Sequence, residues 1–505
     1  MKIPTLAVLL LAALTPAVRA AGPLPKHGDF IAMGGDSITY MSRYSLYVET
    51  YLLATRPDLD LRVMKIQRWC GGTADNYAAE TLDQELIPAK PNIFTVCFGM
   101  NDGGGTEFNS ETGQRYETAL TQIVEQNQAN GTVTVVCSPG VVDTFSYENP
   151  EFAQRLLKSA GATAADPAPS GERIAAIAYN RTLGSLGDVG RRVAEKHGVP
   201  FADIHAAMFD VLQAGVAGYG KSWPPRTSLR RPDRRALICD DGVHPDTAAH
   251  IPMAYAVLKA MRFDGDVGSI DFDWANGSVK TDVAQTVAVP SKGRLELQST
   301  RLPMCFFDDT ACGEGYPSVP VRYVLQHCPF NQDLNRYMLR VSGLPNQPVR
   351  VTWGDRSLVF TREQLQAGVN LAAEFPENPF CPTMHALDRA VWQKQVYERN
   401  LFAILNVPIW NKHFEGAKPA DRSRMLVESL AEFSKWSGGE FSDNPKLLKA
   451  CESVRERALQ DAASVSPMEL SDIRQTLFER DREYHEKARA LVKPVHHVLT
   501  ISLIP

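Results

Sequence analysis

Two short segments of the chain carry the residue types of a nucleophilic hydrolase. Ser37 follows an apolar run and two glycines in the sequence FIAMGGDSIT, residues 30–39. A serine hydroxyl is a poor nucleophile near neutral pH and needs a neighbouring base to accept its proton. The sequence DDGVHPD supplies a candidate base, His244, and Asp241, three residues earlier, is placed to orient the imidazole. These residue types indicate acyl transfer through a covalent serine intermediate.

Two further segments lie between the serine and the histidine. Gly72 lies in WCGGTADNY, and Asn101 lies in FTVCFGMND after a second apolar run. In this order the four segments resemble the motif blocks of the SGNH, or GDSL, hydrolase family, and the resemblance covers roughly residues 28–262. It implies that Ser37 is the nucleophile and that the Ser37 N–H, the Gly72 N–H and the Asn101 amide form an oxyanion hole.

The resemblance also implies the other two members of a catalytic triad, Asp241 and His244. Asp240, the neighbour of Asp241, is an alternative partner for the imidazole, because it is also close to His244 in sequence. The spacing in the family favours Asp241.

These segments must be brought together by the strands and helices around them. Strands are expected at 30–33, 93–98 and 132–136, and helices at 43–54, 117–128 and 171–195. Such alternation is typical of a parallel sheet covered on both faces, with a site at the carboxyl ends of its strands. The family resemblance implies the same class, a three-layer α/β/α, flavodoxin-like sheet.

At 505 residues the chain exceeds the usual size of one core. We predict a catalytic domain at 21–264 and a C-terminal α+β unit at 265–505, with a small β module and an inserted helical portion. A capping box at 466–469 predicts the start of a long helix. Leu499, Ile501 and Leu503 alternate, so the last residues are expected to return as a strand of the β module.

Residues 1–20 have a basic start, a short apolar stretch and a small-residue end, which predicts a secretory signal peptide. We therefore expect a secreted or periplasmic protein. No later segment is long and apolar enough to predict a membrane span. The net charge of −5 gives no reason to expect nucleic acid as a partner. Of the nine cysteines, Cys305 and Cys312 are the first candidates for a disulfide.

No metal or other cofactor is expected. The histidines and cysteines show neither the His-Glu-x-x-His nor the Cys-x-x-Cys spacing of metal sites. The sequence leaves the oligomeric state open.

An arginine-rich loop before Asp241 suggests a substrate. Trp223 precedes this loop, and Trp69 adjoins the Gly72 segment; both indoles are candidates to stack on a sugar ring. Guanidinium groups bind carboxylates, so the loop is a candidate site for an acidic polysaccharide. Alternatively, its arginines pair with nearby aspartates. The arginines are Arg226, Arg230, Arg231, Arg234 and Arg235.

Exported members of the family that the motif blocks resemble include carbohydrate acetylesterases, such as rhamnogalacturonan acetylesterase. The resemblance therefore implies a serine esterase that removes acyl groups, above all acetyl, from a carbohydrate. One alternative is a hydrolase of lipid or aryl esters. Another is a carbohydrate-binding or surface scaffold in which the hydrolase domain is idle.

Overall fold

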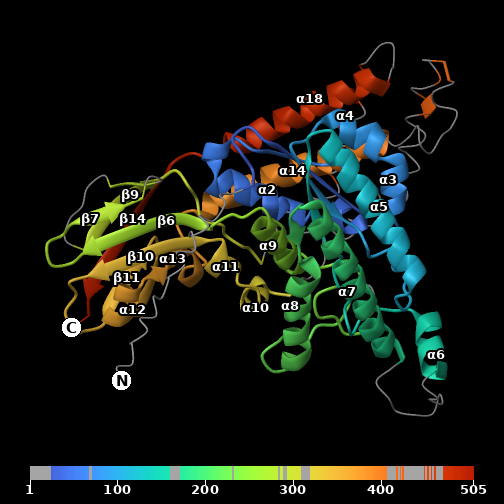
Figure 1. Ribbon diagram of the computed structural model, residues 1–505. Helices are drawn as coiled ribbons and strands as arrows, with labels where there is room; N and C mark the ends of the chain where they lie inside the picture. Colours follow the sequence, from blue (N-terminus) through green and yellow to red (C-terminus); the bar gives the residue numbers. More distant parts are fainter. Residues whose placement is uncertain are drawn as a thin grey trace, which may run out of the picture.

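The N-terminal half of the chain is built on a parallel five-stranded sheet with the order β2-β1-β3-β4-β5 (Figure 1). All four strand pairs are parallel. The predicted α/β/α class is confirmed. The strands are β1 (Phe30–Gly35), β2 (Arg62–Lys65), β3 (Ile93–Cys97), β4 (Val133–Cys137) and β5 (Phe201–Ala202).

The computed structural model describes most of the chain. The described residues are 24–67, 71–159, 171–229, 232–282, 285–287, 293–308, 319–405 and 470–504, with scattered residues between 417 and 464. The predicted signal peptide and the capping box at 466–469 lie outside them. Within those ranges no helix combines the length and the apolar composition that spanning a bilayer requires.

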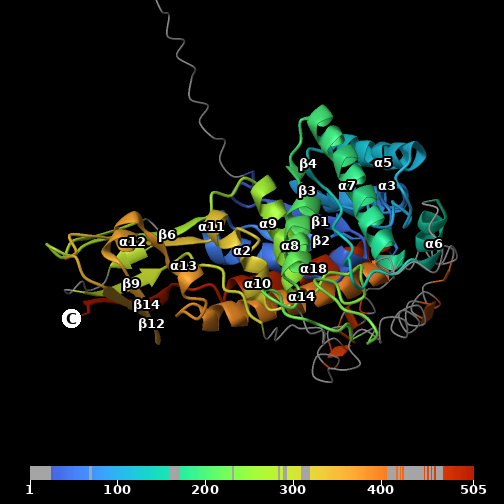
Figure 2. The same ribbon diagram turned by 90° about the horizontal axis from the view of Figure 1, so that it is seen from below.

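Strand order decides which helices cover which face of the first sheet. The step from β1 to β2 runs in one direction, and the later steps to β3, β4 and β5 run in the other. Because such crossovers are right-handed, α2 covers one face, and α3, α5 and α7 cover the opposite face. The last three pack side by side, and α2 packs against α9 (Figures 1 and 2). The helices are α2 (Tyr44–Thr55), α3 (Ala74–Glu80), α5 (Ser110–Ala129), α7 (Gly171–His197), α8 (Ile204–Gly218) and α9 (Ile251–Ala260).

Short helical segments link the larger elements throughout the chain. They are α1 (Ser37–Tyr40), α4 (Ile87–Ala89), α6 (Pro150–Ser159), α10 (Val321–Leu325), α11 (Phe330–Asp333), α12 (Arg362–Ala367), α13 (Leu371–Glu374), the 3-10 turns Pro57–Leu59 and Ala248–His250, and the π-helical turn Leu82–Leu86.

Two further sheets form the β module. One has the order β13-β10-β6-β7, and the other has the order β12-β11-β14-β9-β8. β14 pairs with both β9 and β11, so the prediction that the last residues return as a strand is confirmed. The strands are β6 (Asp266–Asp273), β7 (Val279–Thr281), β8 (Gln285–Val287), β9 (Arg294–Ser299), β10 (Arg336–Ser342), β11 (Val349–Trp353), β12 (Arg356–Phe360), β13 (Val369–Asn370) and β14 (Val495–Leu503).

The helical portion of the C-terminal unit packs on the N-terminal unit. α14 (Cys381–Leu405) and α18 (Leu470–Arg489) lie side by side, and α14 contacts both α2 and β2 (Figure 2). In Figure 2 these two helices run beneath the first sheet. The predicted boundary at 264 therefore separates the parallel sheet from the two sheets of the β module. Two helices from beyond this boundary, α14 and α18, nevertheless pack against the N-terminal unit.

Buried charges join these helices to the first unit. The Lys394 ammonium lies 3.0 Å from Glu49 on α2 and 3.7 Å from Asp481 on α18, and it also contacts Glu398. All four side chains are fully buried. Burial disfavours the ammonium charge, but the three carboxylates outweigh it and hold the pKa of Lys394 well above its usual value. Removing the lysine alone would take away the cation that these three buried carboxylates share.

Cys305 is a free thiol in the structure, so its predicted disulfide with Cys312 is wrong as far as Cys305 is concerned. Cys312 lies outside the described residues. Cys305 instead shares Asn378 with Cys381: its thiol lies 3.7 Å from Asn378 Oδ1, and the Asn378 N–H donates to Cys381 Sγ at 3.4 Å. The pair was not identifiable from spacing, because the β module separates the two residues in sequence.

A buried histidine links the strands of the five-stranded β-module sheet to the neighbouring sheet. The Trp353 indole N–H donates to His497 Nδ1 at 3.1 Å, and His497 Nε2 lies 3.0 Å from both Ser299 Oγ and Tyr337 OH. An indole is a donor only, so Nδ1 must stay unprotonated to accept this bond. Burial lowers the pKa of His497 to about 3.

We expect the β module to lose stability in mild acid because of His497. An unfolded histidine takes up a proton near pH 6.5, whereas folded His497 does so only near pH 3. Between these values the unfolded state binds more protons, so stability falls as the pH falls, by roughly 1.4 kcal/mol per pH unit at most. Urea unfolding midpoints measured at pH 7 and pH 4.5 test this. His497→Gln should lower stability at pH 7 but flatten the acid dependence, whereas His496→Gln, at the exposed neighbouring position, should keep the wild-type slope.

Candidate active site

Crowding explains Gly35, the second of the two glycines before the candidate nucleophile. A Cβ on Gly35 would lie 2.6 Å from the carbonyl oxygen of Cys97 and would also collide with Thr39 Oγ1. The glycine thus lets α1 begin directly against β3. Asp36 caps the helix, since its Oδ1 accepts the Ile38 N–H at 3.0 Å. Ser37 is the first residue of α1, where a backbone N–H has no intrahelical acceptor.

Gly35→Ala is expected to lower both stability and activity. The added methyl group must displace the Cys97 backbone or the helix, a cost of roughly 1–3 kcal/mol. Urea unfolding and the initial rate on p-nitrophenyl acetate measure the two effects. Gly190→Ala in α7 is the matched control, because the added Cβ would lie at an ordinary 3.4 Å from Val136. The control should fold and react normally. Equal behaviour of the two variants would contradict the crowding argument.

The structure brings Ser37, His244 and Asp241 into one hydrogen-bonded relay. His244 Nε2 lies 2.9 Å from Ser37 Oγ, and His244 Nδ1 lies 2.7 Å from Asp241 Oδ2. The other carboxylate oxygen, Oδ1, accepts the N–H groups of Val243 and His244 at 2.9 and 2.8 Å. Asp241 therefore fixes both the imidazole and the turn that carries it.

Asp241 is ionised in this arrangement. Burial alone would favour the neutral acid, but the hydrogen bond and the charge of His244 outweigh it and hold the pKa of Asp241 well below its usual range. The carboxylate can therefore accept a hydrogen bond from the Nδ1–H group and leave Nε2 free to act as a base toward Ser37.

Asp240, the alternative partner for the imidazole, makes other contacts. Its Oδ1 lies 3.2 Å from Arg226 Nη1 and accepts the Leu229 N–H at 3.0 Å. The carboxylate at the imidazole Nδ1 is that of Asp241. The structure thus resolves the choice that spacing within one motif left open.

Asn101 and Gly72 meet at the same end of the sheet. The Asn101 amide donates to the Gly72 carbonyl at 2.9 Å and lies 3.4 Å from Asp36 Oδ2. Asn101 therefore touches both the loop that carries Gly72 and the residue before Ser37. Burial raises the pKa of Asp36 to about 7.

Asp102, which is not among the predicted site residues, braces the candidate oxyanion hole. Its two carboxylate oxygens accept the N–H groups of Ala74 and Gly99, each at 2.9 Å. Asp102 thereby ties the start of α3, just after Gly72, to the loop after β3. Burial raises the pKa of Asp102 to about 6. Its position next to Asn101 in the same motif was the available signal.

Asp143 is a second residue that is not among the predicted site residues. One oxygen of this buried carboxylate accepts the N–H groups of residues 237, 238 and 239, at 2.7, 2.7 and 3.0 Å. It thus shapes the segment that leads into Asp241. Nothing in the sequence near Asp143 marks this role, because its partners lie almost a hundred residues away.

Two predicted substrate residues do not have the roles assigned to them. Trp223 is only 2% exposed, and its ring packs against Gly215 and Tyr323 instead of facing a sugar. Arg226 is paired with Asp240 and Asp246 instead of offering its guanidinium to a substrate. The substrate-binding roles predicted for these two residues are wrong, because Trp223 is buried and Arg226 is ion-paired. For Arg226 the stated alternative, pairing with nearby aspartates, is confirmed. Trp69, Arg230 and Arg231 lie outside the described residues.

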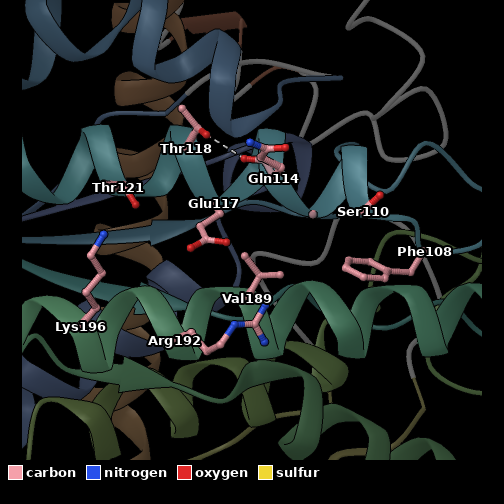
Figure 3. Close-up of a pocket in the computed structure, with 10 residues that line it drawn as sticks. Phe108, Ser110, Gln114, Glu117, Thr118, Thr121, Val189, Arg192 and Lys196 are labelled. Atoms are coloured by element: carbon pink, nitrogen blue, oxygen red, sulfur yellow. Dashed lines mark hydrogen bonds between the residues drawn. The ribbon is translucent and has the colours of Figure 1, made fainter.

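A surface groove of about 650 Å³ lies between α5 and α7 (Figure 3). Phe108 lies at one end, with Arg192 and Lys196 along α7 and Glu117 facing them from α5. None of the four motif segments lines it. In the described part of the chain, no group of three or more histidine, cysteine, aspartate or glutamate side chains is placed to hold a metal ion.

The fold places the hydrogen-bonded side chains of Ser37, His244 and Asp241 at the carboxyl end of a parallel sheet. Residues 34–250 match the model of the GDSL-like lipase/acylhydrolase family. This stretch is therefore a GDSL-like acylhydrolase domain, and it supports an ester hydrolase. The predicted resemblance is thereby confirmed.

The chain is similar to several solved structures, to different extents. The chain resembles a gut microbial diltiazem-metabolizing enzyme with 20% identity and a TM-score of 0.65, over 95% of this chain and 98% of that one. An acetyl-xylooligosaccharide esterase from Geobacillus matches at 22% identity and a TM-score of 0.34, over 48% and 97% of the two chains. An alpha/beta hydrolase from the metagenome of Lake Arreo, Spain, matches at 19% identity and a TM-score of 0.34, over 48% of this chain and 98% of that one. No curated protein matches the chain.

Proposed function

We propose that this protein is an exported serine esterase that removes acyl groups, above all acetyl groups, from a carbohydrate. One observation carries the catalytic part of the proposal: the hydrogen-bonded line from Ser37 Oγ through His244 to Asp241, with distances of 2.9 and 2.7 Å. The line has the order and spacing that serine activation requires.

The chemistry proceeds in two stages. His244 Nε2 takes the Ser37 proton as Oγ attacks the ester carbonyl carbon, and Asp241 stabilises the imidazolium that forms. The N–H groups of Ser37 and Gly72 and the Asn101 amide donate to the developing oxyanion. When the tetrahedral intermediate collapses, His244 protonates the departing alkoxide and an acyl-Ser37 ester remains. His244 then deprotonates a water molecule, which hydrolyses this ester and restores Ser37.

The carbohydrate substrate rests on the resemblance of the four motif blocks to exported carbohydrate acetylesterases. Export rests on the character of residues 1–20. Trp223 and Arg226 give no support, because both are occupied within the protein. The whole-chain likeness to a diltiazem-metabolizing enzyme makes a small-molecule ester the second candidate substrate.

Acyl release from a substrate panel tests the proposal. The panel holds acetylated acidic and neutral polysaccharides, diltiazem, an aryl acetate and a phospholipid, and each is incubated with the wild type and with Ser37→Ala. The proposal expects acetate release from at least one polysaccharide by the wild type only. Mass spectrometry after treatment with a fluorophosphonate should find the label on Ser37.

The other outcomes separate the alternatives. Release from diltiazem, aryl acetate or lipid, with no release from any polysaccharide, would overturn the carbohydrate assignment and keep the serine mechanism. Release that persists in Ser37→Ala would overturn the mechanism. An unlabelled Ser37 and an inactive wild type would favour the scaffold alternative.

A further inference from the structure

One arginine lies between two buried carboxylates that flank the Asp241–His244 turn. Arg226 Nη1 lies 3.2 Å from Asp240 Oδ1, and Nη2 contacts Asp246 Oδ2. Asp240 directly precedes Asp241, and Asp246 follows His244 by two residues. Asp240 and Asp246 are 4% and 5% exposed, and the Arg226 side chain is 12% exposed. The contacts are therefore largely shielded from water. Charge pairs interact more strongly in such an environment than in water.

Further hydrogen bonds close the same turn at its base. The Asp246 N–H donates to the Ile238 carbonyl at 2.7 Å, and the Asp240 N–H donates to Asp246 Oδ1 at 3.2 Å. Cys239 and Pro245 also pair as an isolated bridge. The two ends of the turn thus lie side by side, and their carboxylates face one guanidinium.

Two acidic side chains at the base of this turn share one guanidinium. Burial raises the pKa of Asp246 well above its usual value, the charge of Arg226 opposes this shift, and the charge of Asp240 adds to it. Without Arg226, the side chains of Asp240 and Asp246 would lose the partner that joins the two ends of the turn.

We propose that Arg226 is a positioning residue for catalysis: it clamps Asp240 and Asp246 and so holds the Asp241 carboxylate in line with His244 and Ser37. The inference rests on the proposed serine mechanism. Because Asp240 and Asp241 are adjacent, a shift of the first moves the second, and the Asp241–His244 contact of 2.7 Å has little tolerance for movement. A misplacement of about 1 Å at a reacting group costs on the order of 10²-fold in rate.

Steady-state kinetics on p-nitrophenyl acetate test the clamp. This substrate is too small to need contacts with the arginine-rich loop, so a change in its kcat reports on the catalytic groups. Arg226→Gln should lower kcat on the order of 10²-fold and leave KM within about twofold. Arg226→Lys should recover part of kcat, because an ammonium keeps the charge but lacks the planar fork that serves two carboxylates. If the glutamine variant does not fold, the lysine variant alone carries the comparison.

Arg340→Gln is the control. Arg340 is an exposed arginine on β10, outside the arginine-rich loop, and its guanidinium lies 3.6 Å from the Asp271 carboxylate. Its removal should leave kcat and KM unchanged. Thermal melting of all three variants shows that the chain is folded at the assay temperature.

Two results would overturn the clamp. One is a folded Arg226→Gln variant whose kcat stays within about twofold of the wild type. The other is a raised KM for acidic polysaccharides with an unchanged kcat on p-nitrophenyl acetate, which would make Arg226 a substrate contact. Activity that persists in Ser37→Ala would instead overturn the proposed function, so the two failures are distinguishable.

Discussion

Asp241→Asn is expected to lower kcat on the order of 10⁴-fold while the chain stays folded. The carbonyl oxygen of the introduced amide can still accept the N–H groups of Val243 and His244, which Asp241 now accepts at 2.9 and 2.8 Å. The turn should therefore keep its shape. At the other position an NH₂ group replaces the oxygen that contacts His244 Nδ1 at 2.7 Å. This group donates, so the imidazole must carry its proton on Nε2 and can no longer accept the Ser37 proton.

Kinetics on p-nitrophenyl acetate, with circular dichroism as the check on folding, measure this effect. Asp240→Asn is the informative comparison, because Asp240 has the same side chain one residue earlier and contacts Arg226 instead of the imidazole. It should cost far less in kcat than Asp241→Asn. The opposite ranking would make Asp240 the partner of His244.

Asn101→Ala is expected to lower kcat by about 10²- to 10³-fold with little change in KM. The substitution removes the amide donor of the proposed oxyanion hole, and the oxyanion exists only in the transition state and the tetrahedral intermediate. It also removes the bond of 2.9 Å to the Gly72 carbonyl, which helps to place a second donor.

Asn109→Ala is the matched control for Asn101. Asn109 lies further along the same connection and caps α5, where its side chain accepts the Thr112 N–H at 2.9 Å. Its loss should reduce stability by about 1 kcal/mol and leave kcat unchanged. A raised KM with an unchanged kcat in Asn101→Ala would show that Asn101 binds the ester in its ground state instead.

The fold of the N-terminal half and the arrangement around Ser37 were predictable from local sequence. Apolar runs of strand length alternate with helical stretches, and each motif follows such a run or opens a helix, so the carboxyl ends of the strands had to bring them together. Ser37, Asn101, Asp241 and His244 each lie within a few residues of the element that positions them. Short-range pattern therefore carried most of the information.

The misassigned residues are those whose environment comes from distant sequence. Trp223 is buried against Tyr323, a hundred residues later, and Arg226 is neutralised by two carboxylates of the catalytic turn. Composition cannot distinguish an exposed arginine-rich loop from one that is paired inside the fold. The position of α14 was also not predictable from local sequence. A helical portion was predicted in this unit, but the contact between Lys394 and Glu49 joins α14 to a residue more than three hundred positions away.

The place of β14 at the centre of its sheet bears on how the polypeptide is made. β9 ends at Ser299 and β11 ends at Trp353, but the strand that joins them begins only at Val495. At the usual rate of translation, roughly 10 to 40 s pass between the synthesis of β9 and that of β14. During that time both strands present unpaired edges, which are templates for pairing with other chains. A nascent chain with this topology depends on being kept apart from its copies until synthesis has passed residue 503.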